Sequence, residues 1–329
     1  MINISPKKAK MWSRIGSRAV YGQAILNIAD KLPQLIALSA DLGTSSGLSP
    51  FMRKYPDRFI NVGIAEQNMI GIAAGLAKEG FIPFVSSFAP FLSMRASEQI
   101  RMELGYMEHN VKVVALGSGL ALGFLGNSHY GLEDISIMRS IPNMCVVAPA
   151  DCSEIFKTIE ASANYHGPVY IRLTGGVNNP PVYENEYDFE LGKSILLRSG
   201  NDILIIANGT MLSRAIDAHD ILKDHGISCD VLNMHTIKPM DNKSLKKYSM
   251  NKKLIVSIEE HTIIGGLGSS IAEYFSNTHN RVNHLMLGLP DKFGKTAEYE
   301  FLLNTYGLTG KKISNSILNV LKNKKDKND

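Results

Sequence analysis

A single carboxylate, Glu66, stands at the boundary between two apolar segments. The apolar run 59–65 precedes it, and the Gly/Ala-rich segment 69–77, MIGIAAGLA, follows shortly after. An acid in the first turn of a helix is favoured by the helix dipole, so position alone predicts an exposed structural acid. The small residues that follow allow close backbone approach, however. A carboxyl that loses its water there could share a proton with a ligand.

Further candidates follow the predicted strands of the first half. Ligands of parallel α/β sheets bind outside the carboxyl ends of the strands. The residues at those ends are Asp41 and Ser45, then Glu66, then Phe88 and Phe91, and finally the loop 117–131, which contains His129. An imidazole and a carboxyl can both move protons. The two phenylalanines, taken alone, are more typical of a core than of a ligand site.

Several familiar chemistries have no motif in this chain. There is no Walker A sequence and no G-x-S-x-G elbow, and GGLGSS at 265–270 does not match G-x-G-x-x-G. A closely packed helix N-terminus is the expected role of those glycines. No His/Cys cluster has zinc spacing, so we expect no metal ligands here. A self-sufficient hydrolase, kinase or zinc enzyme is therefore not predicted.

The elements that must position these residues alternate between strands and helices. Near-continuous apolar strands separated by helices indicate a parallel sheet covered on both faces. The strand candidates in the first half are 35–42, 58–64, 81–88, 111–118, 144–150 and 169–174. The helix candidates between them are 17–30, 66–78, 92–107, 132–140 and 152–165.

A polar stretch divides the chain. Residues 175–193 are rich in Gly, Asn, Pro and acids, which is typical of a linker. A second α/β set follows, with strand candidates 202–209, 228–237, 253–261 and 282–289 and helices that begin near 210 and 268 and lie near 313–323. We predict two consecutive parallel-sheet α/β domains, with boundaries 1–176, 177–192 (linker), 193–323 and 324–329 (tail).

Composition agrees with a globular protein in a reducing compartment. The chain has 329 residues, 44% of them hydrophobic, and a formal net charge of +4. Part of that charge lies in the tail, and no basic stripe with aromatic residues precedes it, so nucleic acid is not an expected partner. Cys145, Cys152 and Cys229 form no paired pattern. With no signal sequence and no apolar run of about 18 residues, a cytoplasmic location without membrane contact is expected.

Several segments together resemble the transketolase family. LIALSADLGTSSGL, RFINVGIAEQNMIGIAAGLA, FVSSFAPFLSMRASEQIR, NSHYGLEDISIMRSIPNMCVVAPADCSE and GPVYIRLTGG occur in the order and spacing seen in transketolases. VSIEEHTIIGGLGSSIAE resembles their C-terminal domain. The resemblance extends from about Arg18 to the last helix and is closest to split transketolases, in which two shorter chains form the enzyme.

The resemblance implies a role for most of the candidate residues. Glu66 matches the acid that hydrogen-bonds N1′ of the aminopyrimidine of thiamine diphosphate. Phe88 and Phe91 match the aromatic residues over that ring, and Asp41 matches an acid near the ring system. His129 matches an imidazole that contacts a substrate oxygen and can relay a proton.

A second group of matches concerns the substrate. Arg18, Ser45 and Arg172 align with positions that hold a sugar phosphate, and two guanidiniums and a hydroxyl suit a dianion. Two positions depart from the family pattern: Gly117 replaces a substrate-facing histidine, and Leu125 replaces an aspartate that binds a donor hydroxyl. The resemblance therefore implies ketol transfer with an altered or less hydroxylated sugar.

The chain lacks the family's GDG…N motif, which binds Mg²⁺ and the diphosphate. The resemblance therefore implies half of a cofactor site and a second, N-terminal subunit that completes it, in a heterotetramer with a homodimeric core. His261 and the C-terminal domain are expected to serve packing and subunit contact.

Three alternatives remain open at this stage. The chain could be the beta subunit of a 2-oxo-acid dehydrogenase or a fragment of a 1-deoxyxylulose-5-phosphate synthase. It could also be a non-catalytic scaffold subunit, for which the changes at Gly117 and Leu125 give some support. The segment NSHYGLEDISIMRSIPN and the matches at Arg18 and Ser45 favour transketolase over the dehydrogenase.

Overall fold

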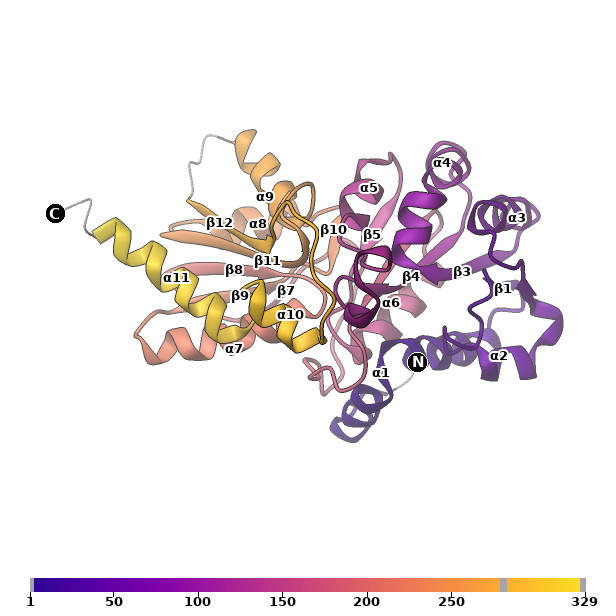
Figure 1. The fold of residues 1–329 in the computed structure, drawn as a ribbon, viewed down its shortest axis with the longest axis horizontal. Helices are drawn as coiled ribbons and strands as arrows, with labels where there is room; N and C mark the ends of the chain where they lie inside the picture. The colour runs from indigo at the N-terminus through magenta and orange to yellow at the C-terminus, as the bar shows by residue number, and fades with distance from the viewer. Residues whose placement is uncertain (1–2, 279–282, 326–329) are drawn as a thin grey trace.

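The computed structural model describes residues 3–278 and 283–325 and contains two sheets, each packed between layers of helices (Figure 1). Most neighbouring strands in both sheets run parallel. The prediction of two consecutive α/β domains is confirmed. The end of the predicted tail, residues 326–329, lies outside the described residues.

The first sheet has seven strands in the order β10-β5-β6-β4-β3-β1-β2. Their bounds are β1 Leu35–Ser39, β2 Phe59–Asn61, β3 Ile82–Phe88, β4 Lys112–Ser118, β5 Cys145–Val147, β6 Val169–Thr174 and β10 Thr236–Lys238. The helices of this half are α1 Pro6–Ala29, α2 Ser49–Lys54, α3 Glu66–Lys78, α4 Ser97–Gln99, α5 Asp134–Ser140 and α6 Cys152–Asn164. The central strands β3, β4 and β6 are buried along almost their whole length because both of their faces are covered.

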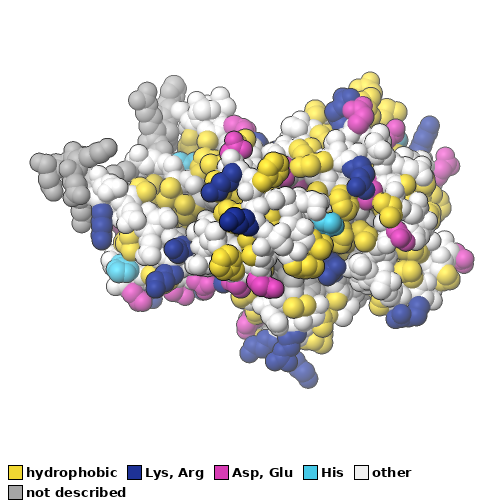
Figure 2. Space-filling model, viewed as in Figure 1, with side chains coloured by type: hydrophobic (Ala, Val, Ile, Leu, Met, Phe, Trp, Pro, Cys, Tyr) yellow, Lys and Arg dark blue, Asp and Glu magenta, His cyan; other side chains and the backbone are white. Residues whose placement is uncertain are grey.

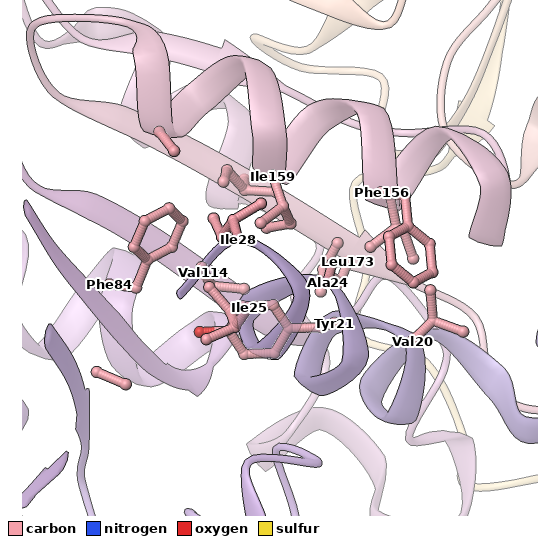
Figure 3. Close-up of a cluster of buried hydrophobic side chains, with 14 of the residues drawn as sticks. Val20, Tyr21, Ala24, Ile25, Ile28, Phe84, Val114, Phe156, Ile159 and Leu173 are labelled. Carbon is pink, nitrogen blue, oxygen red and sulfur yellow. The ribbon is translucent and has the colours of Figure 1, made fainter. Parts of the chain in front are cut away.

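Side chains of β4 alternate between two cores. Val114 and Leu116 pack toward α1 and α6, while Val113 and Ala115 pack toward α3 and α5 on the opposite face. Figure 3 shows the first of these cores, with α1 and α6 lying side by side over the sheet. This three-layer packing holds the carboxyl ends of β1, β3 and β4 at one edge.

The second sheet has five strands in the order β12-β11-β8-β9-β7. Their bounds are β7 Ile195–Arg198, β8 Ile203–Ala207, β9 Cys229–Asn233, β11 Leu254–Thr262 and β12 His284–Leu289. The helices are α7 Met211–Asp224, α8 Asn242–Ser249, α9 Leu267–Ser276, α10 Tyr299–Thr305 and α11 Gly310–Lys325. One face packs against α7 and α11, and the other against α8 and α9. In the described part of the chain, no helix is both long and apolar enough to span a bilayer.

The two sheets are joined in a way that the sequence did not reveal. The candidate strand 228–237 is divided, and its second part, β10, pairs antiparallel with β5 in the first sheet. A segment of the second half thus becomes the edge strand of the first domain. The candidate helix 92–107 also differs, because much of it, Phe91–Arg95 and Ile100–Tyr106, is π-helical.

A buried carboxyl lies where the two domains meet. Glu154 of α6 is fully buried and accepts a hydrogen bond from the Ala150 backbone N–H at 2.7 Å. The amide of Asn233, in β9 of the second domain, donates to both of its oxygens, at 2.9 and 3.2 Å. Burial raises the pKa of Glu154 to about 8, since removal of water disfavours the charged form.

This raised pKa predicts a pH-dependent contribution to stability. Between pH 4.5 and 8 the folded chain keeps the Glu154 proton, whereas the unfolded chain has lost it. The contribution of Glu154 to stability is therefore greatest below pH 4.5 and falls by roughly 3–5 kcal/mol as pH rises to 8. In Glu154→Gln, which cannot ionise, this fall should be absent. Urea unfolding of both proteins from pH 5 to 9 measures the difference, and parallel pH profiles would contradict the prediction.

Candidate functional site

Helix α3 begins at Glu66, and its first turn places this carboxyl inside the domain. The side chain is 1% exposed. Ser87 Oγ, at the end of β3, donates to Glu66 Oε1 at 3.0 Å. Arg95 Nη1 donates to Glu66 Oε2 at 2.7 Å. The buried acid thus has a partner on each oxygen.

The partner on one oxygen, Arg95, lies half outside the fold. Its side chain is 46% exposed, and its guanidinium carbon lies 4.3 Å from the centre of the Phe91 ring. Both residues belong to the π-helical segment Phe91–Arg95 and lie four positions apart, on one face of it. Because the guanidinium is already partly hydrated, moving it away from the Glu66 carboxylate would expose little additional buried surface of Arg95.

Three rings gather beside this ion pair. His129 lies edge-on to both phenylalanines, with ring centres 5.8 Å from Phe88 and 5.5 Å from Phe91. The two phenylalanine rings are 6.1 Å apart. Ser128 Oγ lies 3.0 Å from His129 Nδ1. The structure therefore brings together Phe88, Phe91 and His129, which the sequence placed after two different strands.

Asp41 lies two residues past the end of β1, on the same edge of the sheet. It is exposed and adopts φ 58°. Its backbone N–H donates to Asn61 Oδ1 at 3.0 Å, and the Asn61 amide donates back to the Asp41 carboxylate at 3.2 Å. This reciprocal pair links the ends of β1 and β2 and fixes the direction of the acid.

Arg18 and Ser45 are both exposed and lie on neighbouring segments. The loop after β1 approaches α1 so closely that a Cβ added at Gly47 would lie 2.3 Å from the Arg18 carbonyl oxygen. Gly47 has φ +79°, which also favours glycine. A guanidinium and a hydroxyl thus come from adjacent segments at the surface.

Arg172 is placed differently from the other two phosphate candidates. It is 1% exposed, and its Nε donates to both oxygens of the fully buried Asp134, at 3.0 and 2.9 Å. Its Nη2 donates to the carbonyl oxygens of Gly131 and Glu260, at 2.9 and 2.8 Å. Nη1 donates to Thr174 at 3.1 Å. The guanidinium is committed to the interior, away from Arg18 and Ser45 at the surface.

Two residues, Gly117 and Leu125, differ from the pattern expected for the family, and the structure shows what surrounds each of them. Gly117 adopts φ +61°, and a Cβ there would lie 2.7 Å from a methyl carbon of Leu122. Leu125 is 42% exposed on the loop that carries His129. Neither position offers a polar side chain to a hydroxyl.

Two family models match the chain. Residues 13–177 match the pyrimidine-binding domain of transketolase, and residues 192–313 match the transketolase C-terminal domain. The chain belongs to the transketolase family. Its fold class and its likeness to the split members of that family are confirmed.

Individual relatives agree with this assignment. A putative transketolase C-terminal section of Methanocaldococcus jannaschii is 43% identical, over 93% of this chain and 96% of that protein. A 6-deoxy-6-sulfo-D-fructose transketolase subunit of a Clostridium species is 39% identical, over 90% and 91%. A solved split-gene transketolase, described as an inactive β4 tetramer, superposes with a TM-score of 0.85 at 38% identity and covers 94% of this chain and 98% of that one.

Transketolases depend on thiamine diphosphate, and the residues present suit one half of it. A buried carboxyl next to flat apolar rings fits an aminopyrimidine, which needs a hydrogen-bonding acid at one edge and apolar contact on its faces. No group of His, Cys, Asp or Glu side chains within residues 3–278 and 283–325 could hold a metal ion. The donor set in the described residues thus fits the aminopyrimidine ring.

No pattern in the sequence pointed to Arg95 or Asp134. A π-helical turn has no residue pattern that distinguishes it from an ordinary helix, so the approach of Arg95 to Glu66 was not predicted. Asp134 lies in the first turn of α5, where an acid is favoured by the helix dipole and usually faces water. His261, expected to be structural, is fully buried, and burial lowers its pKa to about 4.

The position of Arg172 predicts a large loss of stability on substitution. Arg172→Met would leave the Asp134 carboxylate buried without its cation, which costs about 3–5 kcal/mol. Arg18→Ala, at an exposed site, should change the free energy of unfolding by less than about 0.5 kcal/mol. Chemical denaturation of both variants measures this contrast. Equal stabilities would show that Arg172 does not support the fold.

Proposed function

We propose that this chain is the C-terminal subunit of a thiamine-diphosphate-dependent transketolase-type transferase that moves a two-carbon ketol unit between sugars. The observation that supports it most is the cluster of Glu66, Phe88, Phe91 and His129 at one sheet edge. These residues come from three separate segments and form the kind of surface that a pyrimidine ring requires. When bound, thiamine diphosphate supplies the carbon nucleophile.

The residues of this chain would orient the coenzyme and place protons. Glu66 would share a proton with the aminopyrimidine at N1′, while Phe88 and Phe91 would hold that ring by apolar contact. Asp41 would lie near the ring system. His129 would contact a substrate oxygen and relay a proton to it or from it.

The substrate would carry a distal anion. Arg18 and Ser45 remain candidates for its recognition because both are exposed on adjacent segments. Arg172 would act through the fold instead, since its donors are engaged inside the chain. The apolar Leu125 suits a sugar in which the hydroxyl that an aspartate would bind is absent or modified. A sulfo-sugar, as in the name of the Clostridium relative, has such an anion.

Activity would require an N-terminal partner subunit that binds the diphosphate and Mg²⁺. The absence of cation ligands in the described residues supports this, as does the description of the solved relative as an inactive β4 tetramer. We infer a cytoplasmic heterotetramer, with domains at 1–176 and 193–323 and a linker at 177–192. A 2-oxo-acid dehydrogenase subunit would instead take part in the decarboxylation of pyruvate. A scaffold subunit would catalyse no reaction.

Glu66→Gln should lower turnover of the two-chain enzyme by about 10²-fold or more, because an amide cannot exchange a proton with the pyrimidine. Two-carbon transfer between sugars is measured with the purified complex, beside pyruvate decarboxylation. Glu79→Gln is the control, since Glu79 lies exposed just past the end of the same helix. Chromatography should show that both variants assemble. Unchanged turnover in Glu66→Gln would favour the scaffold.

The chain alone should bind thiamine diphosphate and Mg²⁺ weakly, because it lacks ligands for the charged half of the coenzyme. Calorimetric titration of the isolated subunit and of the two-chain complex compares the affinities. Tight stoichiometric binding to the isolated subunit would contradict a shared site.

A further inference from the structure

The loop that carries His129 is held from outside its own domain. The segment that connects β12 to α10, residues 290–298, runs along this loop (Figure 1). On the face drawn in Figure 2, basic and hydrophobic side chains mix where the two domains meet. Phe293 of the segment and Phe124 of the loop are 87% and 65% exposed. On the side of the segment, the contacts with the loop involve mainly backbone atoms.

Asn127 makes a reciprocal hydrogen bond across this contact. Its Nδ2 donates to the Gly294 carbonyl oxygen at 2.8 Å, and its Oδ1 accepts from the Gly294 N–H at 3.0 Å. Both polar ends of one amide are thus matched to one residue of the C-terminal domain. Asn127 lies two positions before His129.

A second contact lies on the other side of His129. Tyr130 Oη lies 2.8 Å from the Lys295 carbonyl oxygen and 3.2 Å from that of Gly123. The Ala297 N–H donates to the Gly123 carbonyl oxygen at 3.2 Å. A Cβ at Gly123 would lie only 2.4 Å from the Ala297 carbonyl oxygen, so the close approach requires glycine.

The start of the same loop is held by a buried acid of β11. Glu260 Oε1 accepts from the Leu120 N–H at 2.6 Å, and its other oxygen accepts from Thr210 and Tyr299 at 2.8 and 2.6 Å. Gly119 and Gly131 then close the base of the loop with two backbone hydrogen bonds. The contacts at Leu120, Asn127 and Tyr130 involve the C-terminal domain, whereas the base of the loop is also held by Arg172 of β6, which donates to the Gly131 carbonyl oxygen.

The His129 ring has few contacts of its own. It touches the two phenylalanine rings and Ser128 Oγ, all near the surface. The backbone between Asn127 and Tyr130, which the C-terminal domain holds on both sides, places the ring against these three partners.

We propose that the C-terminal domain positions His129 and that Asn127 is the positioning residue through which it does so. This inference rests on the proposed function for the role of His129, but the contact itself does not. The two hydrogen bonds to Gly294 hold the loop on the N-terminal side of His129, and the hydrogen bond of Tyr130 holds it on the C-terminal side. The second domain thereby sets the distance between a proton-relaying ring and the coenzyme surface.

The test compares Asn127→Ala with a matched control in the two-chain enzyme. Asn164→Ala also removes an exposed amide that donates to a backbone carbonyl, that of Glu160, but far from the loop in sequence and on α6. Tyr130→Phe removes a single hydroxyl and serves as a second variant. For each, kcat and KM for two-carbon transfer, the thermal midpoint and the backbone hydrogen exchange of residues 126–131 are measured.

Asn127→Ala should lower kcat by about 10-fold to 100-fold, the effect of a misplaced catalytic group. KM and the thermal midpoint should stay near wild type, because the Asn127 side chain is exposed and lies outside the core. Exchange of the His129 and Tyr130 amides, both bonded to the Gly126 carbonyl, should quicken. Tyr130→Phe should act in the same direction, and Asn164→Ala should change nothing by more than about 2-fold.

Two results would overturn the proposal. Unchanged exchange in Asn127→Ala would show that Gly294 does not hold the loop, and faster exchange with unchanged kcat would show that the anchoring does not serve His129. If the wild-type two-chain enzyme transferred no two-carbon unit, the proposed function would fail. In that event the exchange rates alone would support or overturn the anchoring of the loop.

Discussion

The buried ion pair between Arg172 and Asp134 is the constraint on which the junction of the two domains depends. Both charges lie in the interior, where losing water costs several kcal/mol for each ion. The geometry offsets this cost: Tyr170 donates to the carboxylate at 2.9 Å, and the guanidinium reaches the carbonyls of Gly131 and Glu260. One side chain of β6 therefore binds α5, the base of the His129 loop and β11 at once.

The ion pair of Glu66 with Arg95 has the opposite character. Its acid is as buried as Asp134, yet its cation is 46% exposed and stacks on a phenylalanine at the surface. An ion pair that is buried on both sides is fixed, whereas one that is open on the cation side can exchange its partner. The difference in exposure, more than the distance between the charges, separates a structural acid from one that is available to a ligand.

The sequence could predict the parts of this molecule that follow from local pattern. The apolar strands and the start of α3 at Glu66 follow from periodicity and helix chemistry, so Glu66, Phe88 and His129 could be placed at strand ends. The burial of Arg172 could not be predicted. An arginine in an apolar strand can point toward the surface as well as toward the interior, and the sequence does not distinguish the two. The antiparallel pairing of β10 with β5 depends on tertiary contacts between distant segments, which no local pattern encodes.

The contacts of the C-terminal domain with the His129 loop could not be predicted from the sequence either, because they too depend on tertiary structure. Its contacts with the loop use the carbonyl and N–H of Gly294 and the carbonyl of Lys295, and any residue type offers a carbonyl. Such contacts leave no motif, so the sequence indicated only packing. Together with Glu260, they hold the His129 loop from the second domain. In our proposal the second domain thereby aligns the imidazole, and the two domains act as one functional unit.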